Sequence, residues 1–153
     1  GQEPFGAFGV ALEGGDPING KSLFLGHTAA SCSKCHALKQ TDKQIGPSLE
    51  GIAERLTRTE LLESMLDPQA KVTLGYGIQT LALEDGRSVV GTQLDETAQQ
   101  ITLKNTDSKV ETFDKSEIRS MTAPIGAMPT MKGIVSKRDL RDLVAYLATL
   151  KSD

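Results

Sequence analysis

The sequence predicts a mainly α-helical chain with a small antiparallel β-sheet inserted at about residues 72–120. Apolar residues recur at helical spacing near the C-terminus, an Asp-Pro pair gives a helix start near the N-terminus, and the inserted stretch changes to an alternating, extended pattern. The 153 residues are enough for one domain with one core and an insertion. We therefore expect a single domain over residues 16–151, preceded by a flexible, glycine-rich lead-in or linker at residues 1–15.

Three helices are expected in the main part of the chain. Asp16-Pro17 opens the first, with Asp16 as N-cap, and this helix runs to about Leu25. A shorter helix is expected over residues 58–66. The last helix begins after Ser136, and its apolar face comprises Leu140, Leu143, Val144, Leu147 and Leu150.

The insertion is expected to contain about four strands. Residues 76–83 and 87–94 alternate around Asp85-Gly86, which is a hairpin signal. Residues 99–104 and 109–113 form a second pair. The charges of this stretch are of mixed sign, so the insertion is expected either to cover part of the main domain and add stability or to offer a docking platform.

Composition excludes several classes of partner. The formal net charge of -3 leaves no basic footprint for nucleic acid. No apolar run approaches the roughly 20 residues that a membrane-spanning helix needs. Residues 1–15 lack the pattern of a signal peptide, so the chain is expected to be a mature form or a piece of a longer one.

Both cysteines of the chain lie in Cys32-Ser33-Lys34-Cys35-His36. Two cysteines alone would also fit a disulfide, a redox pair or half of a zinc site. A structural zinc site needs four ligands, and His27 is the only other histidine. A thioredoxin-like pair would not need His36 and would lie in a βαβ pattern, which is missing here. Two thiols followed at once by an imidazole are typical of covalent haem c attachment, with Cys32 and Cys35 linked to the haem and His36 bound to its iron.

A six-coordinate haem iron needs a second axial ligand. The candidates are Met65, Met121, Met128, Met131 and His27. We favour Met128, because its loop precedes the last helix and is stiffened by Pro124 and Pro129. Met131 on the same loop is the nearest rival, and an open sixth position is the remaining alternative.

Five motifs in order resemble those of class I cytochrome c: Gly20-x-x-x-Phe24, Cys32-Ser33-Lys34-Cys35-His36, Ile45-Gly46-Pro47-Ser48-Leu49, Ala127-Met128-Pro129 and Asp142-Leu143-Val144-Ala145-Tyr146-Leu147. The resemblance covers about residues 16–71 and 121–151 and implies a cytochrome c fold. It further implies that the first and last helices cross, with Gly20 and Phe24 meeting Leu143 and Tyr146. It also implies that the Pro47 carbonyl accepts a hydrogen bond from His36. The inserted strands resemble those of haem-binding domains of planctomycete and verrucomicrobial proteins.

The function expected is single-electron transfer through one covalent haem c with His36 and Met128 as iron ligands, and no catalysis. The alternative is a haem peroxidase, reductase or sensor with an open sixth site. The expected partners are redox proteins, for a free carrier or for the electron-accepting domain of a larger dehydrogenase. The resemblance implies attachment of haem outside the cytoplasm, so a periplasmic or other extracytoplasmic location is expected.

Overall fold

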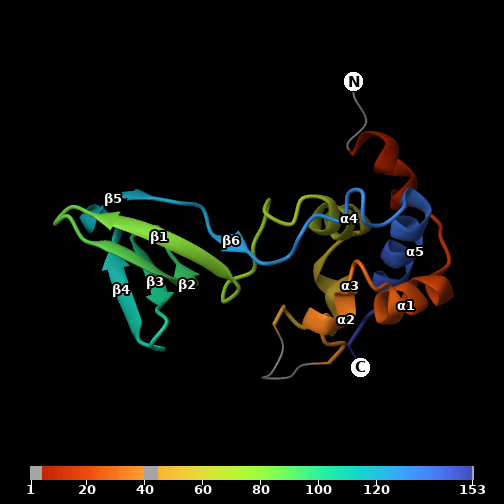
Figure 1. Ribbon diagram of the computed structural model, residues 1–153, viewed down its shortest axis with the longest axis horizontal. Helices are drawn as coiled ribbons and strands as arrows, with labels where there is room; N and C mark the ends of the chain where they lie inside the picture. Colours follow the sequence, from red (N-terminus) through yellow and green to blue (C-terminus); the bar gives the residue numbers. More distant parts are fainter. Residues whose placement is uncertain (1–4, 40–44, 153) are drawn as a thin grey trace. The chain divides into compact units, whose positions relative to one another are not determined.

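The computed structural model describes residues 5–39 and 45–152. It divides into two compact units, which Figure 1 shows with their helices and strands labelled. The first, here called the helical unit, comprises Gly1–Ala70 and Pro129–Asp153, and the second, the sheet unit, comprises Lys71–Met128.

Within residues 5–39 and 45–152, the helical unit contains one 3-10 helix and five α-helices. These are η1 (Gly6–Leu12), α1 (Pro17–Gly26), α2 (Cys32–Cys35), α3 (Ile52–Arg55), α4 (Arg58–Leu66) and α5 (Lys137–Leu147). Within the described ranges, none of these helices is both long and apolar enough to cross a membrane.

The three longer helices, α1, α4 and α5, each begin directly after a residue whose side chain caps the helix. The Asp16 carboxylate accepts a hydrogen bond from the Ile18 N–H at 2.9 Å, ahead of Pro17 at the first helical position. Thr57 and Glu60 form a reciprocal capping box at the start of α4. Each of these contacts lies within a few residues along the chain, which is why sequence predicted α1 and α4 closely.

Helices α1 and α5 pack side by side and form the centre of the helical unit (Figure 1). Gly20 lies directly against the backbone carbonyl of Asp142, where a side chain would not fit. The rings of Phe24 and Tyr146 meet with centroids 5.9 Å apart. The contact expected between the first and last helices is therefore present.

The segment expected as a flexible lead-in differs from that expectation where it is described. Residues 6–12 form the 3-10 helix η1, and Ala11 is completely buried. Arg58 explains the difference: its guanidinium donates to the carbonyls of Leu12 at 2.8 Å and Gly14 at 2.7 Å. These donors satisfy carbonyls that a glycine-rich segment cannot pair by itself.

The sheet unit is one antiparallel sheet with strand order β4-β3-β2-β1-β5, and β6 also pairs with β1. The strands are β1 (Gly77–Leu83), β2 (Ser88–Glu96), β3 (Gln100–Lys104), β4 (Val110–Asp114), β5 (Ile118–Met121) and β6 (Ile125–Gly126). The first four lie close to the ranges that alternation predicted. One face holds the core of the unit, formed by Leu81, Leu83, Ile101, Leu103 and Phe113.

The predicted fold class is wrong. The chain is a mixed α/β protein with 34% helix and 22% strand, rather than a mainly α protein with a small insert. The prediction missed β5 and β6, which add two strands to the sheet and pair with β1. Both are too short to show a period, and their pairing partners lie more than 30 residues earlier in the chain, so no local pattern marks them.

This architecture also contradicts the predicted family. A six-stranded sheet with its own core is not part of a mainly α class I cytochrome c fold. The resemblance to that class, including its planctomycete and verrucomicrobial relatives with inserted strands, is therefore wrong for the chain as a whole.

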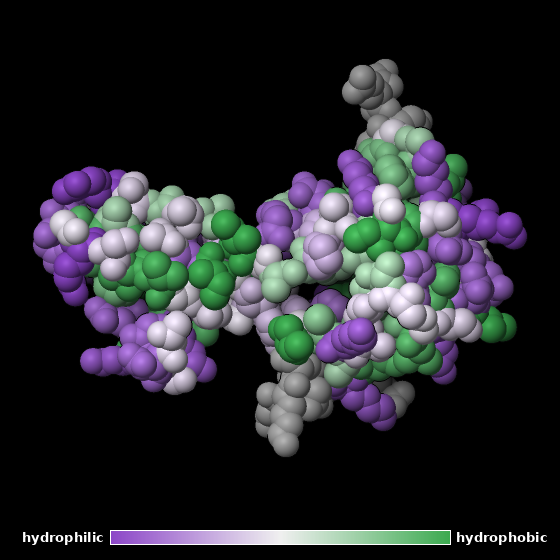
Figure 2. All heavy atoms as spheres, viewed as in Figure 1, coloured by the Kyte–Doolittle hydropathy of each residue, from purple (hydrophilic) through white to green (hydrophobic). Residues whose placement is uncertain are grey.

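The second face of the sheet carries exposed aliphatic side chains among threonines. Ile78 and Ile125 are paired neighbours on β1 and β6 and are 50% and 60% exposed. Figure 2 shows apolar side chains at the surface of this unit.

Candidate haem-binding site

The cysteine-histidine motif forms a single turn of helix. Helix α2 spans Cys32–Cys35, and the backbone N–H of His36 closes the turn on the Cys32 carbonyl at 2.9 Å. Ser31 precedes it with a left-handed φ of 53°. Both thiols are free and only partly buried. This turn presents two thiols and one imidazole from positions 32, 35 and 36 of one short segment.

The environment of Cys32 counts against thiol redox chemistry. Burial is the largest influence and raises the pKa of the Cys32 thiol; neighbouring Cys35 raises it further, and a backbone hydrogen bond only partly opposes them. Catalytic dithiols have a depressed pKa, because the thiolate is the reactive form, and the direction at Cys32 is the opposite.

The hydrogen bonding of His36 leaves one ring nitrogen able to bind a metal. Its Nδ1 lies 2.8 Å from the carbonyl oxygen of Pro47. A carbonyl can only accept, so Nδ1 carries the proton and donates it. The lone pair of the neutral imidazole is then on Nε2, which is the arrangement of a metal-binding histidine oriented by a carbonyl.

Backbone hydrogen bonds connect the residues around Pro47 to the motif. The N–H of Gly46 donates to the Cys35 carbonyl at 2.8 Å, and the N–H of Leu49 donates to the Ala37 carbonyl at 2.9 Å. These two bonds hold the Pro47 carbonyl beside the His36 ring. The expected contact between these two residues is therefore present.

His27 has the opposite tautomer. The backbone N–H of Ala30 donates to its Nδ1 at 3.0 Å, so Nδ1 holds the lone pair and Nε2 carries the proton. Neither nitrogen of a neutral ring in this state can bind iron while the hydrogen bond persists. His27 caps the turn that leads into α2, which removes it from the candidates for the sixth ligand.

The four methionines lie in different surroundings. Met65 and Met131 are buried in the helical unit, at 6% and 3% exposure. Met121 on β5 is exposed, whereas Met128 is partly buried and is the last residue of the sheet unit. The chain directly after Met128 is anchored to the end of α4, because the Thr130 hydroxyl donates to the Leu66 carbonyl at 2.6 Å.

Two exposed aliphatic residues flank the motif in the sequence. Leu25 precedes it and Ile45 follows it, and they are 55% and 66% exposed. Leu25 belongs to the end of α1 that meets α2, where the Ser33 hydroxyl reaches the Leu25 carbonyl at 3.5 Å. The motif therefore combines two thiols and one imidazole nitrogen, and exposed aliphatic residues lie on either side of it in the sequence.

The zinc alternative finds no support in residues 5–39 and 45–152. No group of three or more His, Cys, Asp or Glu residues in those ranges is placed to hold a metal ion. Structural zinc sites need four such ligands.

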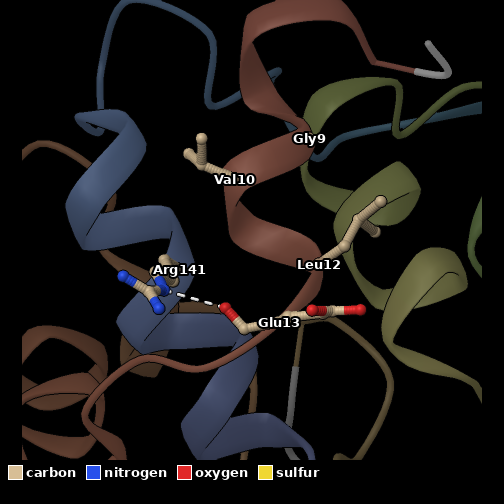
Figure 3. A pocket seen from close by; sticks show the side chains of 5 residues that line it. All are labelled: Gly9, Val10, Leu12, Glu13 and Arg141. Atoms are coloured by element: carbon tan, nitrogen blue, oxygen red, sulfur yellow. Dashed lines mark hydrogen bonds between the residues drawn. The ribbon is translucent and has the colours of Figure 1, made fainter.

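An open cavity of about 460 Å³ lies elsewhere in the helical unit (Figure 3). It is lined by Gly9, Val10, Leu12, Glu13 and Arg141. The Arg141 Nε donates to the backbone carbonyl of Glu13 at 2.8 Å, the contact drawn in Figure 3. The cavity lies between η1 and α5, and its lining contains neither a thiol nor an imidazole.

No family model matches the chain, and no curated protein matches it significantly. The comparisons therefore give no support to the expected class I cytochrome c family. The candidate site depends on the residues of this chain alone.

Proposed function

We propose that the protein binds one haem c through Cys32, Cys35 and His36 and transfers single electrons. The observation that carries the proposal is the 2.8 Å distance between Nδ1 of His36 and the carbonyl oxygen of Pro47. A carbonyl only accepts, so this contact leaves Nε2 of His36 for a metal, immediately after two free thiols in one helical turn. A disulfide or a redox pair does not need that arrangement, and a zinc site would need further ligands besides His36 and the two cysteines.

The residues have separate roles. Cys32 and Cys35 hold the haem by thioether bonds, which keep it attached without a deep pocket. His36 binds the iron, and Pro47 orients the imidazole and raises its basicity through the hydrogen bond. The haem, when bound, supplies the one-electron iron couple.

Met128 is proposed as the sixth ligand. A thioether opposite an imidazole raises the reduction potential and closes the iron to small molecules. The proposal follows from the proline-flanked loop that contains Met128 and from the exclusion of His27 by its tautomer. A closed iron supports electron transfer over a peroxidase, reductase or sensor function.

The proposed partners are redox proteins, and the proposed location is periplasmic or otherwise extracytoplasmic. Covalent attachment is the feature that links the protein to that compartment. Finding the haem-loaded protein only in a cytoplasmic fraction would contradict the location.

Covalent attachment is tested on the denatured protein. We expect acidified organic solvent to leave the haem on the chain, and we expect the intact mass to include one haem. Cys32→Ala and Cys35→Ala should each leave at most a single thioether, whereas Ser33→Ala, an exposed position between them, should change neither result. Complete extraction of the haem from the parent protein would refute the proposed function.

A further inference from the structure

The face of the His36 ring is covered by Gly46. A Cβ added to Gly46 would lie 2.9 Å from Cε1 of His36, 3.1 Å from Nδ1 and 3.3 Å from Nε2. A Cβ in the ring plane beyond Cε1 would be much farther from both nitrogens than from Cε1. The near-equal distances therefore place this position over the flat face of the imidazole.

We propose that Gly46 is a positioning residue that fixes the plane of the His36 imidazole. The hydrogen bond from Nδ1 to the Pro47 carbonyl fixes one edge of the ring but still allows the ring to tilt about that bond. The backbone of Gly46 blocks the tilt toward one side. The Gly46 N–H donates to the Cys35 carbonyl at 2.8 Å, so the backbone of Gly46 is held in place by the cysteine-histidine motif itself.

The glycine is required by this contact and not by its own backbone conformation. The glycines with positive φ are Gly6, Gly14, Gly15, Gly51, Gly75, Gly86 and Gly133, and Gly46 is not one of them. An alanine can adopt a φ outside the left-handed region without strain. Any effect of Gly46→Ala should therefore come from the methyl group pressing on the imidazole.

The consequence for an iron ligand has a definite direction. A methyl group at this position would push the ring away and lengthen its hydrogen bond to the Pro47 carbonyl. A weaker hydrogen bond makes the imidazole less basic and stabilises ferric iron less. Gly46→Ala should therefore raise the reduction potential and change the ferric electron paramagnetic resonance spectrum, which responds to the orientation of the axial ring. This consequence rests on the proposed function.

The matched control is Gly26→Ala. Gly26 lies in the same unit, also outside the left-handed region, and an added Cβ would meet nothing within 4 Å. This variant should keep the parental potential and spectrum. A raised potential in Gly46→Ala alone supports the proposal, and parental values in a haem-loaded Gly46→Ala overturn it.

A second measurement tests the contact without depending on the variant or on haem. In the full chain as isolated, a nuclear Overhauser effect is expected between Hε1 of His36 and the Hα protons of Gly46. Its presence supports the proposal even if Gly46→Ala does not fold, and its absence overturns the proposal. The haem content of the parent is read separately from its intact mass, so a parent without haem that still shows this effect would refute the proposed function alone.

Discussion

At the scale of single residues, the two histidines differ through what their neighbours offer to Nδ1. His36 faces a carbonyl, which accepts, and His27 faces an N–H, which donates. The same imidazole can therefore offer Nε2 to a metal in one place and caps a turn in the other. The motif is the ground for proposing His36 as an iron ligand, but both tautomers depend on backbone groups that reach these rings only after folding.

The identity of the sixth ligand is also decided at this scale. Met128→Ala should open the iron to carbon monoxide, and Met128→His should keep six ligands but lower the reduction potential, because imidazole favours ferric iron more than a thioether does. Absorption spectra with and without carbon monoxide, together with redox titration, measure both effects.

Met131→Ala is the control for Met128. Because Met131 is only 3% exposed, its truncation should cost about 2–5 kcal/mol of stability. The absorption band that reports a sulfur ligand on the iron, here called the sulfur-ligation band, should remain. Loss of that band in Met131→Ala and its survival in Met128→Ala would reverse the assignment. If neither substitution affects the band, the result favours the alternative of a haem enzyme or sensor with an open sixth coordination position.

At the scale of elements, the helices were predictable where their ends are capped locally, as at Asp16 and Thr57. The short helices α2 and α3 have no side-chain cap and were not predicted. The lead-in was also misread, because η1 depends on Arg58, which lies 44 residues beyond Gly14 in the sequence. Long-range donors of this kind leave no periodic signal.

The crossing of α1 and α5 depends on the absence of a side chain at Gly20. A Cβ there would approach the Asp142 carbonyl and lie 2.7 Å from the Tyr146 Cβ, so the two helices would have to separate. Gly20→Ala should destabilise the protein by about 3 kcal/mol or more, since overpacking against backbone cannot relax easily. Gly26→Ala on the same helix should change stability by less than about 1 kcal/mol. Urea denaturation measures both, and equal midpoints would contradict the crossing.

Asp142 joins the same two helices and makes their contact sensitive to acid. Its carboxylate accepts from the Asp16 N–H and the Asn19 amide, both at 2.8 Å. Burial is the largest single influence and opposes ionisation. The hydrogen bonds from Asn19 and Asp16, helped by Arg138 and Arg141, together outweigh it and lower the pKa of Asp142.

A carboxyl whose pKa is lower in the folded state stabilises the fold above its unfolded value, which is about 3.9. The contribution is lost as pH falls through the folded value. Asp142→Asn should cost about 1–3 kcal/mol at pH 7, because its amide would face the Asn19 amide. The difference from the parent should shrink toward about pH 3, where the parent loses the same contribution. Urea denaturation at both pH values checks this, and a constant difference would contradict it.

At the scale of the whole molecule, sequence predicted the position of the sheet but not its size or independence. The alternation in residues 76–113 marks four strands, since each hairpin pairs neighbours in sequence. Strands β5 and β6 both return to β1, and neither was predicted; β6 lies in the loop from Pro124 to Pro129, whose prolines and glycine gave no strand signal. The sheet unit also has its own buried cluster, which makes it a second compact unit rather than a decoration of the helical one.

Two leucines test whether the units have separate cores. Leu81 is completely buried in the sheet unit, and Leu143 is 1% exposed in the helical unit. Leu→Ala at either position should cost about 2–5 kcal/mol. If each core stabilises its own unit, Leu81→Ala should lower the urea midpoint of the amide resonances of β1–β3 and leave the haem absorption transition in place. Leu143→Ala should shift the haem transition and leave the sheet resonances. Because the two substitutions are chemically identical, each serves as the control for the other. A shared shift of both signals by either variant would mean that the chain unfolds as one cooperative core, contrary to the division into two units.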